Sequence, residues 1–396
     1  MHIYDFDKSK KIIKREMDLR IKENHEKLNM EMEIYKTEQS IGIKIIDERE
    51  KNYNIEDFES SFTCVKNKVI GVKNLKSRLI YKSISNKTIK YNEYINCEFN
   101  NIKFENCNFY GTSFKNCKFN KVYFSNCDFH EKGGVIDMFN DNCQFIDCIF
   151  DNTDLKHVVF KDSIFKKIKF NFTNLRNVIF SCCEINNILF CDCNLKSAKI
   201  IDTYINIFNF EDTYLTKVDE NTFFDKLEVK NHDDYENLFK IYKNISTIYE
   251  NNRLLSCSGE YYYLAKCMER KSLKGIERLK SKIFWMICGY GERPTFALVT
   301  SFEIVLLFAI IYIFAGLSIN GQVINYGFDI LKYFSSRAIY IDFIRCFYFS
   351  LVTFTSVGYG DIFPIGYSII FSCIEMILGV TMVGVWTATL ARKITR

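Results

Sequence analysis

Residues 347–364 read Phe-Tyr-Phe-Ser-Leu-Val-Thr-Phe-Thr-Ser-Val-Gly-Tyr-Gly-Asp-Ile-Phe-Pro and place two glycines around one aromatic residue inside a strongly apolar region. In hydrocarbon every backbone carbonyl needs a partner, so non-helical backbone persists there only where protein buries it or where it lines a water-filled cavity. Gly358 and Gly360 have no Cβ and can adopt backbone angles closed to other residues, so successive carbonyls can turn toward one axis. A row of such carbonyls can replace the hydration shell of a cation.

This stretch resembles the pore loop of potassium channels, because it matches Thr-x-x-Thr-x-Gly-Tyr-Gly-Asp with Ser356 at the second threonine. The resemblance implies potassium sites built from the carbonyls of Ser356, Val357, Gly358 and Tyr359, with Gly360 completing a filter; residues 356–360 are called the predicted filter below. It also implies a homotetramer, since one chain supplies one loop and the family uses four. Potassium would be the permeant ion, with no cofactor. Four further residues are expected to support the filter: Thr353, Thr355, Tyr348 and Asp361.

Two aromatic residues depart from the family pattern. The paired tryptophans common before this motif are Tyr348 and Phe349 here. Tyr348 can still donate a hydrogen bond to Asp361, whereas Phe349 has no donor. The alternative of a weakly selective cation channel therefore stays open.

A second Gly-Tyr-Gly, at residues 289–291, serves as a control. It precedes Pro294 and the first apolar span, lacks the Thr-Ser-Val lead and lies among basic residues. We expect it to be a bend at the membrane edge, which favours the pore interpretation for the later copy alone.

The apolar stretches predict an all-α membrane domain. The spans at about residues 295–317 and 365–391 are long enough to cross a bilayer, and residues 342–355 are short enough for a re-entrant pore helix. Glu303 and Glu375 lie in the two spans with roles left open. Gly379 and Gly384 can act as a gating hinge or allow close helix packing, and both alternatives stand.

Basic residues flank the spans and predict their orientation. They precede the first span and follow the second, so both termini of a multi-pass cell-membrane protein are expected to be cytoplasmic. These residues are Arg270, Lys271, Lys274, Arg278, Lys280, Lys282 and Arg293 before the first span, and Arg392, Lys393 and Arg396 after the second.

From about Tyr94 to Leu215 the chain repeats every five residues, a period that fits neither a helix nor an alternating strand. Large apolar residues recur at one position, and mostly small or β-branched residues two positions earlier, as in Phe99 and Cys97. This pattern resembles the pentapeptide-repeat family, which implies a right-handed quadrilateral β-helix of about five to six coils, about 25 Å long. The period slips between Phe129 and Phe145, so residues 133–139 are expected to bulge as a candidate binding loop.

The 16 cysteines are expected to be thiols in a reducing cytosol, because the amino terminus has no apolar signal-peptide core. Cys182, Cys183, Cys191 and Cys193 suggest a zinc site, but the period places Cys183 and Cys193 inward and the other two outward, so packing is the favoured role. A net charge of +5 is too mild to indicate nucleic-acid binding. DNA mimicry by an acidic face is also disfavoured, since acids and bases nearly balance across the repeats.

The remaining segments complete a multi-domain α and β chain. We expect a charged helical segment at 1–60, a β-rich cap at 61–93, the β-helix at 94–216, a helical connector with a basic collar at 217–293 and the pore domain at 294–396. The connector has apolar stripes at helical spacing and no assigned site.

The predicted function is a non-enzymatic, potassium-selective channel. Neither a voltage-sensing helix nor a nucleotide-binding motif is visible, so gating stays unassigned. Regulation through the β-helix, by a protein or small molecule, is expected. The alternative from another class is a membrane-anchored interaction scaffold built on the β-helix.

Overall fold

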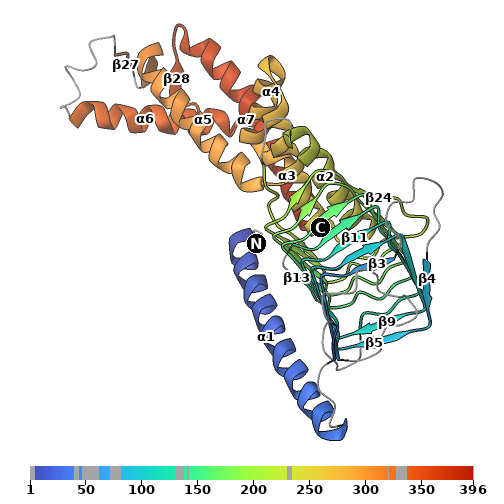
Figure 1. Cartoon of the computed structure of the whole chain (residues 1–396). Helices are drawn as coiled ribbons and strands as arrows, with labels where there is room; N and C mark the ends of the chain where they lie inside the picture. The colour runs from blue at the N-terminus through green and yellow to red at the C-terminus, as the bar shows by residue number, and fades with distance from the viewer. Residues whose placement is uncertain are drawn as a thin grey trace. The chain divides into compact units, whose positions relative to one another are not determined.

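The computed structural model describes residues 5–39, 44–46, 62–71, 82–130, 138–140, 142–229, 234–319, 321–326 and 337–395. The chain divides into two compact units, residues 1–272 and residues 273–396, each with its own core. Figure 1 shows a coiled stack of short strands in the first unit and a group of helices in the second.

The first unit is a four-sided parallel β-helix in which each strand pairs with the strand one coil later. One face contains β1 (Lys44–Ile46), β2 (Thr63–Lys66), β6 (Glu93–Ile95), β10 (Ser113–Lys115), β13 (Met138–Asn140), β16 (Val159–Lys161), β19 (Ile179–Ser181), β22 (Lys199–Ile201) and β25 (Phe223–Phe224). The second contains β3 (Val69–Gly71), β7 (Glu98–Asn100), β11 (Lys118–Asn120), β14 (Gln144–Ile146), β17 (Ile164–Lys166), β20 (Glu184–Ile185) and β23 (Tyr204–Ile205). The third contains β4 (Lys82–Ser85), β8 (Ile102–Glu105), β12 (Tyr123–Ser125), β15 (Ile149–Asp151), β18 (Ile168–Asn171), β21 (Ile188–Cys191) and β24 (Phe208–Phe210). The fourth is formed by β5 (Thr88–Lys90), β9 (Asn108–Tyr110) and isolated bridges that continue from Asp128 to Lys217.

The five-residue period produces this geometry through its corners and its core. Most corner residues before the small inward position have a positive φ, as at Asn96 (54°) and Asn116 (50°), and asparagine tolerates that conformation better than most residues. Large inward side chains stack from coil to coil, with ring centroids 4.7 Å apart for Phe99 and Phe119. Inward thiols donate to the previous coil, as Cys117 does to the Tyr94 carbonyl at 3.3 Å.

Two expectations about the β-helix differ from the structure. The seven-stranded faces give about seven turns, more than expected, because strands before residue 94 already pair with the later coils. Phe139 does not belong to a bulging loop: β13 continues the ladder, and its ring is fully buried between Phe114 and Phe160. The slip is therefore shorter than expected, and Gly133 lies outside the described residues.

Helix α1 (Phe6–Gln39) lies along the first face of the β-helix (Figure 1). At one end Phe6 contacts Phe223 and Tyr261, with centroids 5.7 and 6.3 Å away. At the other end Tyr35 stacks on Phe62 at 4.2 Å. The predicted helix is thus a strap that spans the stack of coils.

Helices α2 (Asp234–Asn251) and α3 (Leu255–Ser272) cover the carboxyl end of the β-helix. The apolar stripes of the predicted connector share one core with the coils. Their tyrosines also satisfy backbone groups of the last coil: Tyr242 accepts from the Leu227 amide at 2.8 Å, and Tyr261 donates to the Phe224 carbonyl at 2.9 Å. A solenoid needs such a cap because its last coil has no neighbour.

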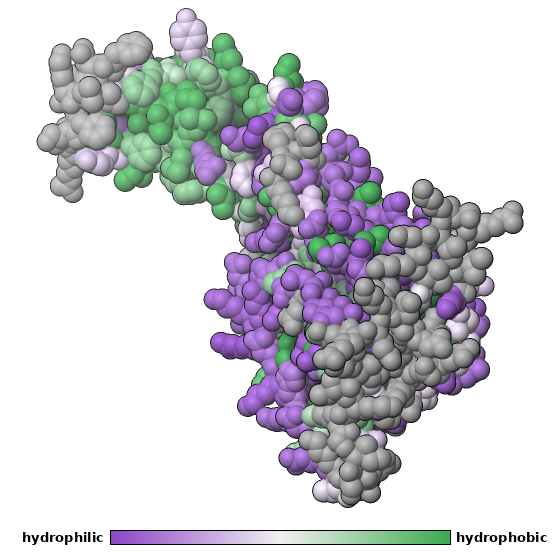
Figure 2. Space-filling view, in the orientation of Figure 1, coloured by the Kyte–Doolittle hydropathy of each residue, from purple (hydrophilic) through white to green (hydrophobic). Residues whose placement is uncertain are grey.

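The second unit begins with α4 (Gly275–Cys288) and the turn η2 (Gly289–Gly291). Within the residues that the structure describes, two helices are long and apolar enough to cross a membrane, α5 (Pro294–Ala315) and α7 (Ser368–Ile394). Between them lies α6 (Arg337–Phe354), which begins five residues earlier than expected for the pore helix. Figure 2 shows these helices presenting a largely hydrophobic surface.

A small antiparallel sheet, unexpected from the sequence, completes the second unit. It consists of β26 (Leu317–Ile319) between β27 (Gln322–Ile324) and β28 (Ile362–Pro364). Because β28 directly follows Asp361, this sheet connects the carboxyl-terminal end of the predicted filter to the end of α5.

Candidate functional site

The predicted filter follows α6 directly, and its backbone alternates between left-handed residues, which have a positive φ, and residues that do not. Ser356, Gly358 and Gly360 have φ of 56°, 61° and 75°, whereas Val357 and Tyr359 are not among the residues of positive φ. Such alternation lets successive carbonyls face one side. Serine at a left-handed position costs roughly 1–2 kcal/mol, so the surrounding contacts must hold it.

The last turn of α6 fixes the amino-terminal end of the predicted filter. The amides of Ser356 and Val357 donate to the carbonyls of Thr353 and Val352, each at 3.0 Å. The Thr355 hydroxyl donates a hydrogen bond to the Leu351 carbonyl at 2.7 Å. Of the expected supports, Thr353 is buried, so it belongs to the packing of this turn.

Aromatic contacts hold the carboxyl-terminal end of the predicted filter. The Tyr348 ring stacks on Tyr359 with centroids 6.4 Å apart and planes 5° apart. The Tyr348 hydroxyl also interacts electrostatically with the Asp361 carboxylate. Phe349 points elsewhere: it is buried edge-on against Tyr312 of α5 at 4.9 Å. Its lack of a donor therefore suits an apolar site inside the subunit.

Within one chain the predicted filter is open to the surroundings. The Val357 and Tyr359 side chains are 54 % and 70 % exposed. Apart from the adjacent residues, no heavy atom of the described part of the chain lies within 4 Å of a Cβ placed on Gly358 or Gly360.

The two glycines of α7 have different surroundings. A Cβ on Gly379 would overlap the Phe354 carbonyl oxygen at the end of α6, whereas a Cβ on Gly384 would meet nothing within 4 Å. Close packing therefore accounts for Gly379, and the chain itself gives no packing reason for Gly384.

The two membrane acids also differ. Glu303 on α5 is exposed, whereas Glu375 on α7 is fully buried. Tyr312 donates to Glu375 Oε2 at 2.6 Å, and Ser350 of α6 contacts Oε1. The sequence predicted neither partner, because they lie 63 and 25 residues away along the chain.

The first Gly-Tyr-Gly forms the expected bend, with positive φ at Gly289, Tyr290 and Gly291. It leads to an ion pair that the sequence did not indicate. Glu292 is buried, and its Oε1 lies 3.0 Å from a guanidinium nitrogen of Arg392 near the end of α7.

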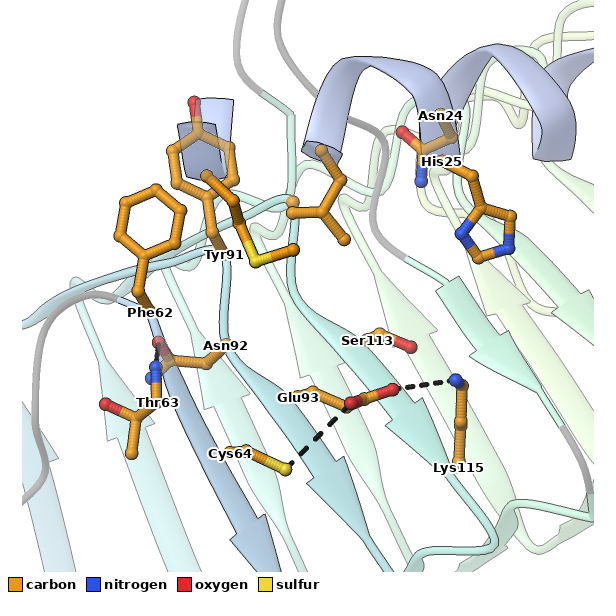
Figure 3. A pocket seen from close by; sticks show the side chains of 13 residues that line it. Asn24, His25, Phe62, Thr63, Cys64, Tyr91, Asn92, Glu93, Ser113 and Lys115 are labelled. Carbon is orange, nitrogen blue, oxygen red and sulfur yellow. Dashed lines mark hydrogen bonds and ion pairs between the residues drawn. The ribbon is translucent and has the colours of Figure 1, made fainter. Parts of the chain in front are cut away.

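A separate pocket of about 190 Å³ lies between α1 and the first coils of the β-helix (Figure 3). Its polar side holds the Glu93–Lys115 ion pair at 2.7 Å and the buried hydroxyl of Ser113, which has no hydrogen-bond partner among the described residues. The remaining lining is Asn24, His25, Leu28, Met32, Phe62, Thr63, Cys64, Tyr91, Asn92 and Gly111.

The zinc interpretation of the cysteines gains no support from their placement. Cys183 and Cys193 are buried in the core, Cys182 is exposed, and Cys191 is half-buried, so the predicted inward and outward positions are confirmed. Among the residues that the structure describes, no cluster of His, Cys, Asp and Glu could hold a metal ion.

Comparison with known proteins assigns both parts of the chain. Residues 328–396 match the ion-channel family, and residues 95–131 and 141–177 match pentapeptide repeats. No curated protein matches the chain. The N-terminal part therefore carries pentapeptide repeats and the C-terminal part is an ion-channel domain.

Two solved structures that are similar to the chain are trypsin-treated variants of QnrB1, a plasmid-mediated fluoroquinolone resistance protein. The first is 10 % identical, with a TM-score of 0.16, and covers 43 % of this chain and 89 % of its own. The second is 17 % identical, with a TM-score of 0.12, and covers 28 % and 60 %. The four-sided β-helix rests on the strand pairing described above.

Proposed function

We propose that this protein is a potassium-selective channel in which four copies each contribute one predicted filter to a common axis. The observation that carries the proposal is the alternating backbone of residues 356–360 in a chain with an ion-channel domain. Its carbonyls can coordinate a dehydrated cation, but one chain leaves this segment exposed, so further copies are needed to enclose the ion.

The proposed orientation places both termini in the cytoplasm. Basic residues lie on α4 and at the end of α7, where the positive-inside rule expects the cytosolic side. Helix α4 also exposes large apolar residues beside its bases, among them Ile276 and Leu279 at 72 % and 58 %, which suits a helix lying at the membrane surface.

Bilayer recording of the purified full-length protein under a potassium gradient tests the channel. We expect a current that reverses near the potassium equilibrium potential and is lost in Gly358→Ala, because alanine is strained at φ 61°. The matched control is Gly366→Ala, which places alanine at a similar left-handed φ of 56° outside the predicted filter. A monomeric protein without potassium flux in liposomes would instead favour the scaffold alternative.

Reversal potentials in mixed sodium and potassium solutions decide the remaining alternative of a weakly selective cation channel. We expect potassium to be preferred, since Tyr348 braces Tyr359 and Asp361 while Phe349 serves the packing of α5. Equal permeability of the two ions would overturn the potassium-selective function. The protein would then be a weakly selective cation channel.

We further propose that the pocket beside α1 takes a small regulatory molecule with an apolar part and a hydrogen-bonding end. Phe62, Tyr91 and Met32 offer the apolar side, while Ser113 and Glu93 offer polar groups. The variant Ser113→Leu fills the pocket and is expected to change open probability without changing conductance. Ser85→Leu, on the exposed side of β4, is the control, and an unchanged open probability in Ser113→Leu would contradict this role.

A further inference from the structure

The buried carboxyl of Glu375 joins all three helices of the ion-channel domain. It lies on α7, accepts from Tyr312 of α5 at 2.6 Å and contacts Ser350 of α6. A buried charge is stable only with close compensation. In the described part of the chain its hydrogen-bond partners are these two neutral hydroxyls, and no ion pair reaches it.

The proton count around Ser350 assigns Glu375 a neutral state. The Ser350 hydroxyl lies 2.8 Å from the Val305 carbonyl oxygen and also contacts Glu375 Oε1. These two contacts and that of Tyr312 require three protons, but the two hydroxyls carry one each. All three become hydrogen bonds when Glu375 is protonated: its O–H donates to Ser350, and Ser350 donates to Val305.

A second contact joins the same helices one turn further along. Gly379 follows Glu375 by four residues on α7, and Phe354 follows Ser350 by four residues on α6. A Cβ on Gly379 would overlap the Phe354 carbonyl oxygen, so the two backbones touch there. Residues four apart share one face of a helix, so α7 holds the last turn of α6 at two successive points.

We propose that Glu375, as a neutral carboxyl, is a positioning residue for the predicted filter: with Gly379 it fixes the last turn of α6, from which residues 356–360 emerge. The path is short. Ser356 and Val357 donate their amides to carbonyls of that same turn, each at 3.0 Å. The inference rests on the proposed channel function. It adds that the contact of Glu375 with α6 supports the predicted filter.

Hydrogen exchange measured by mass spectrometry on the purified full-length protein tests the inference without requiring conduction. In Glu375→Leu, Tyr312 loses its acceptor and α7 loses its link to Ser350. We expect exchange of the peptide containing Val357 to rise roughly tenfold, as expected for losing a net hydrogen bond or two. Glu375→Gln is expected to retain the wild-type rate, because a neutral amide can donate to Ser350 and accept from Tyr312. Glu303→Leu, which removes an exposed acid from α5, is the matched control.

Recordings of the same variants supply the functional readout. The potassium-to-sodium permeability ratio is expected to fall roughly tenfold in Glu375→Leu and to be retained in Glu375→Gln. If Glu375→Leu does not assemble, Ser350→Ala removes the serine contacts with Glu375 and Val305, keeps the Tyr312 hydrogen bond and is expected to give the same direction of change. Wild-type exchange rates in both Glu375→Leu and Ser350→Ala would overturn the positioning role. An exchange rate in Glu375→Gln as high as that in Glu375→Leu would overturn the neutral state of Glu375. A wild-type protein that does not conduct would refute the proposed function, while the exchange experiment would still decide the role of Glu375.

Discussion

At the scale of single residues, the five-residue period assigns opposite environments to neighbours. Cys182 is exposed at a corner, while Cys183 is buried and donates to the Phe160 carbonyl of the previous coil at 3.4 Å. Burial raises the pKa of the Cys183 thiol to about 12, so no thiolate is available at neutral pH. We expect maleimide to label Cys182 in the native protein and Cys183 only after unfolding, as located by peptide mass spectrometry. Equal labelling of both would show that the inward assignment is wrong.

The glycines of α7 give a second residue-scale prediction. Gly379→Ala should displace the end of α6, since the added methyl group meets the Phe354 backbone, whereas Gly384→Ala should not. Overpacking of this kind costs about 1–3 kcal/mol. We expect a matching loss of thermal stability in Gly379→Ala alone, measured in detergent. Equal stability of the two variants would favour a hinge over close packing at Gly379.

The sequence identified inward residues well and distant partners poorly. The period specified which side of the backbone Phe99, Cys183 and Cys193 occupy, because each inward position recurs every five residues. The surroundings of Glu375 and Gly379 depend on how three helices cross, and no local pattern records that. Ser356 could be placed in a motif, but its positive φ could not be anticipated from a serine.

At the scale of elements, α1 is held to the β-helix by few contacts, several of them charged. Lys10 lies 3.0 Å from Asp225 and pairs with Asp202, while Lys14 pairs with Asp202 at 2.6 Å. Apolar contact comes from Phe6, Ile13 and Met17, with Tyr35 at the far end of the helix. A sparse apolar pattern therefore predicted a helix but not its location.

The docking of α1 is expected to weaken in acid. Burial alone would raise the pKa of Asp202, but hydrogen bonds and ion pairs with Lys10 and Lys14 outweigh it and lower that pKa. A lowered folded-state pKa gives stability that is present above the ordinary Asp pKa of about 3.9 and is lost as pH falls through the folded value. The loss is roughly 1 kcal/mol for such partly exposed pairs. The distance distribution between spin labels on α1 and β19, measured by electron paramagnetic resonance, should broaden below about pH 4.

Asp202→Asn is the control for this prediction. It removes the titrating group, so its distance distribution should be broader at neutral pH and less dependent on acid. If the distance distributions of the two proteins broaden identically in acid, a group other than Asp202 causes the weakening of α1 docking.

The five-residue period does not reveal strands that lie outside the regular repeats. Strands β2 to β5 join the ladder although the regular repeats begin later, since pairing needs only a compatible backbone and one inward residue such as Val65 or Ile84. The sheet of β26, β27 and β28 has strands of three residues, too short to show a pattern.

At the scale of the whole molecule, two units with separate cores are joined by a short stretch of chain. Helix α3 ends at Ser272 and α4 begins at Gly275, whose φ is 55°. The cap formed by α2 and α3 belongs to the core of the β-helix. We expect a change in the coils that displaces α3 to reach α4 through this stretch of backbone.

Lengthening this junction tests that path. Four residues of Gly-Ser inserted after Ser272 behave as flexible coil and relax the connection. We expect conductance and selectivity to stay unchanged, because the ion-channel domain has its own core, while the effect of Ser113→Leu on open probability disappears. Single-channel recording of four proteins, with and without the insertion and with and without Ser113→Leu, measures the coupling as a double-variant cycle. If Ser113→Leu acts equally in both backgrounds, the signal reaches the pore by a route other than the junction, and the connection between α3 and α4 has no part in gating.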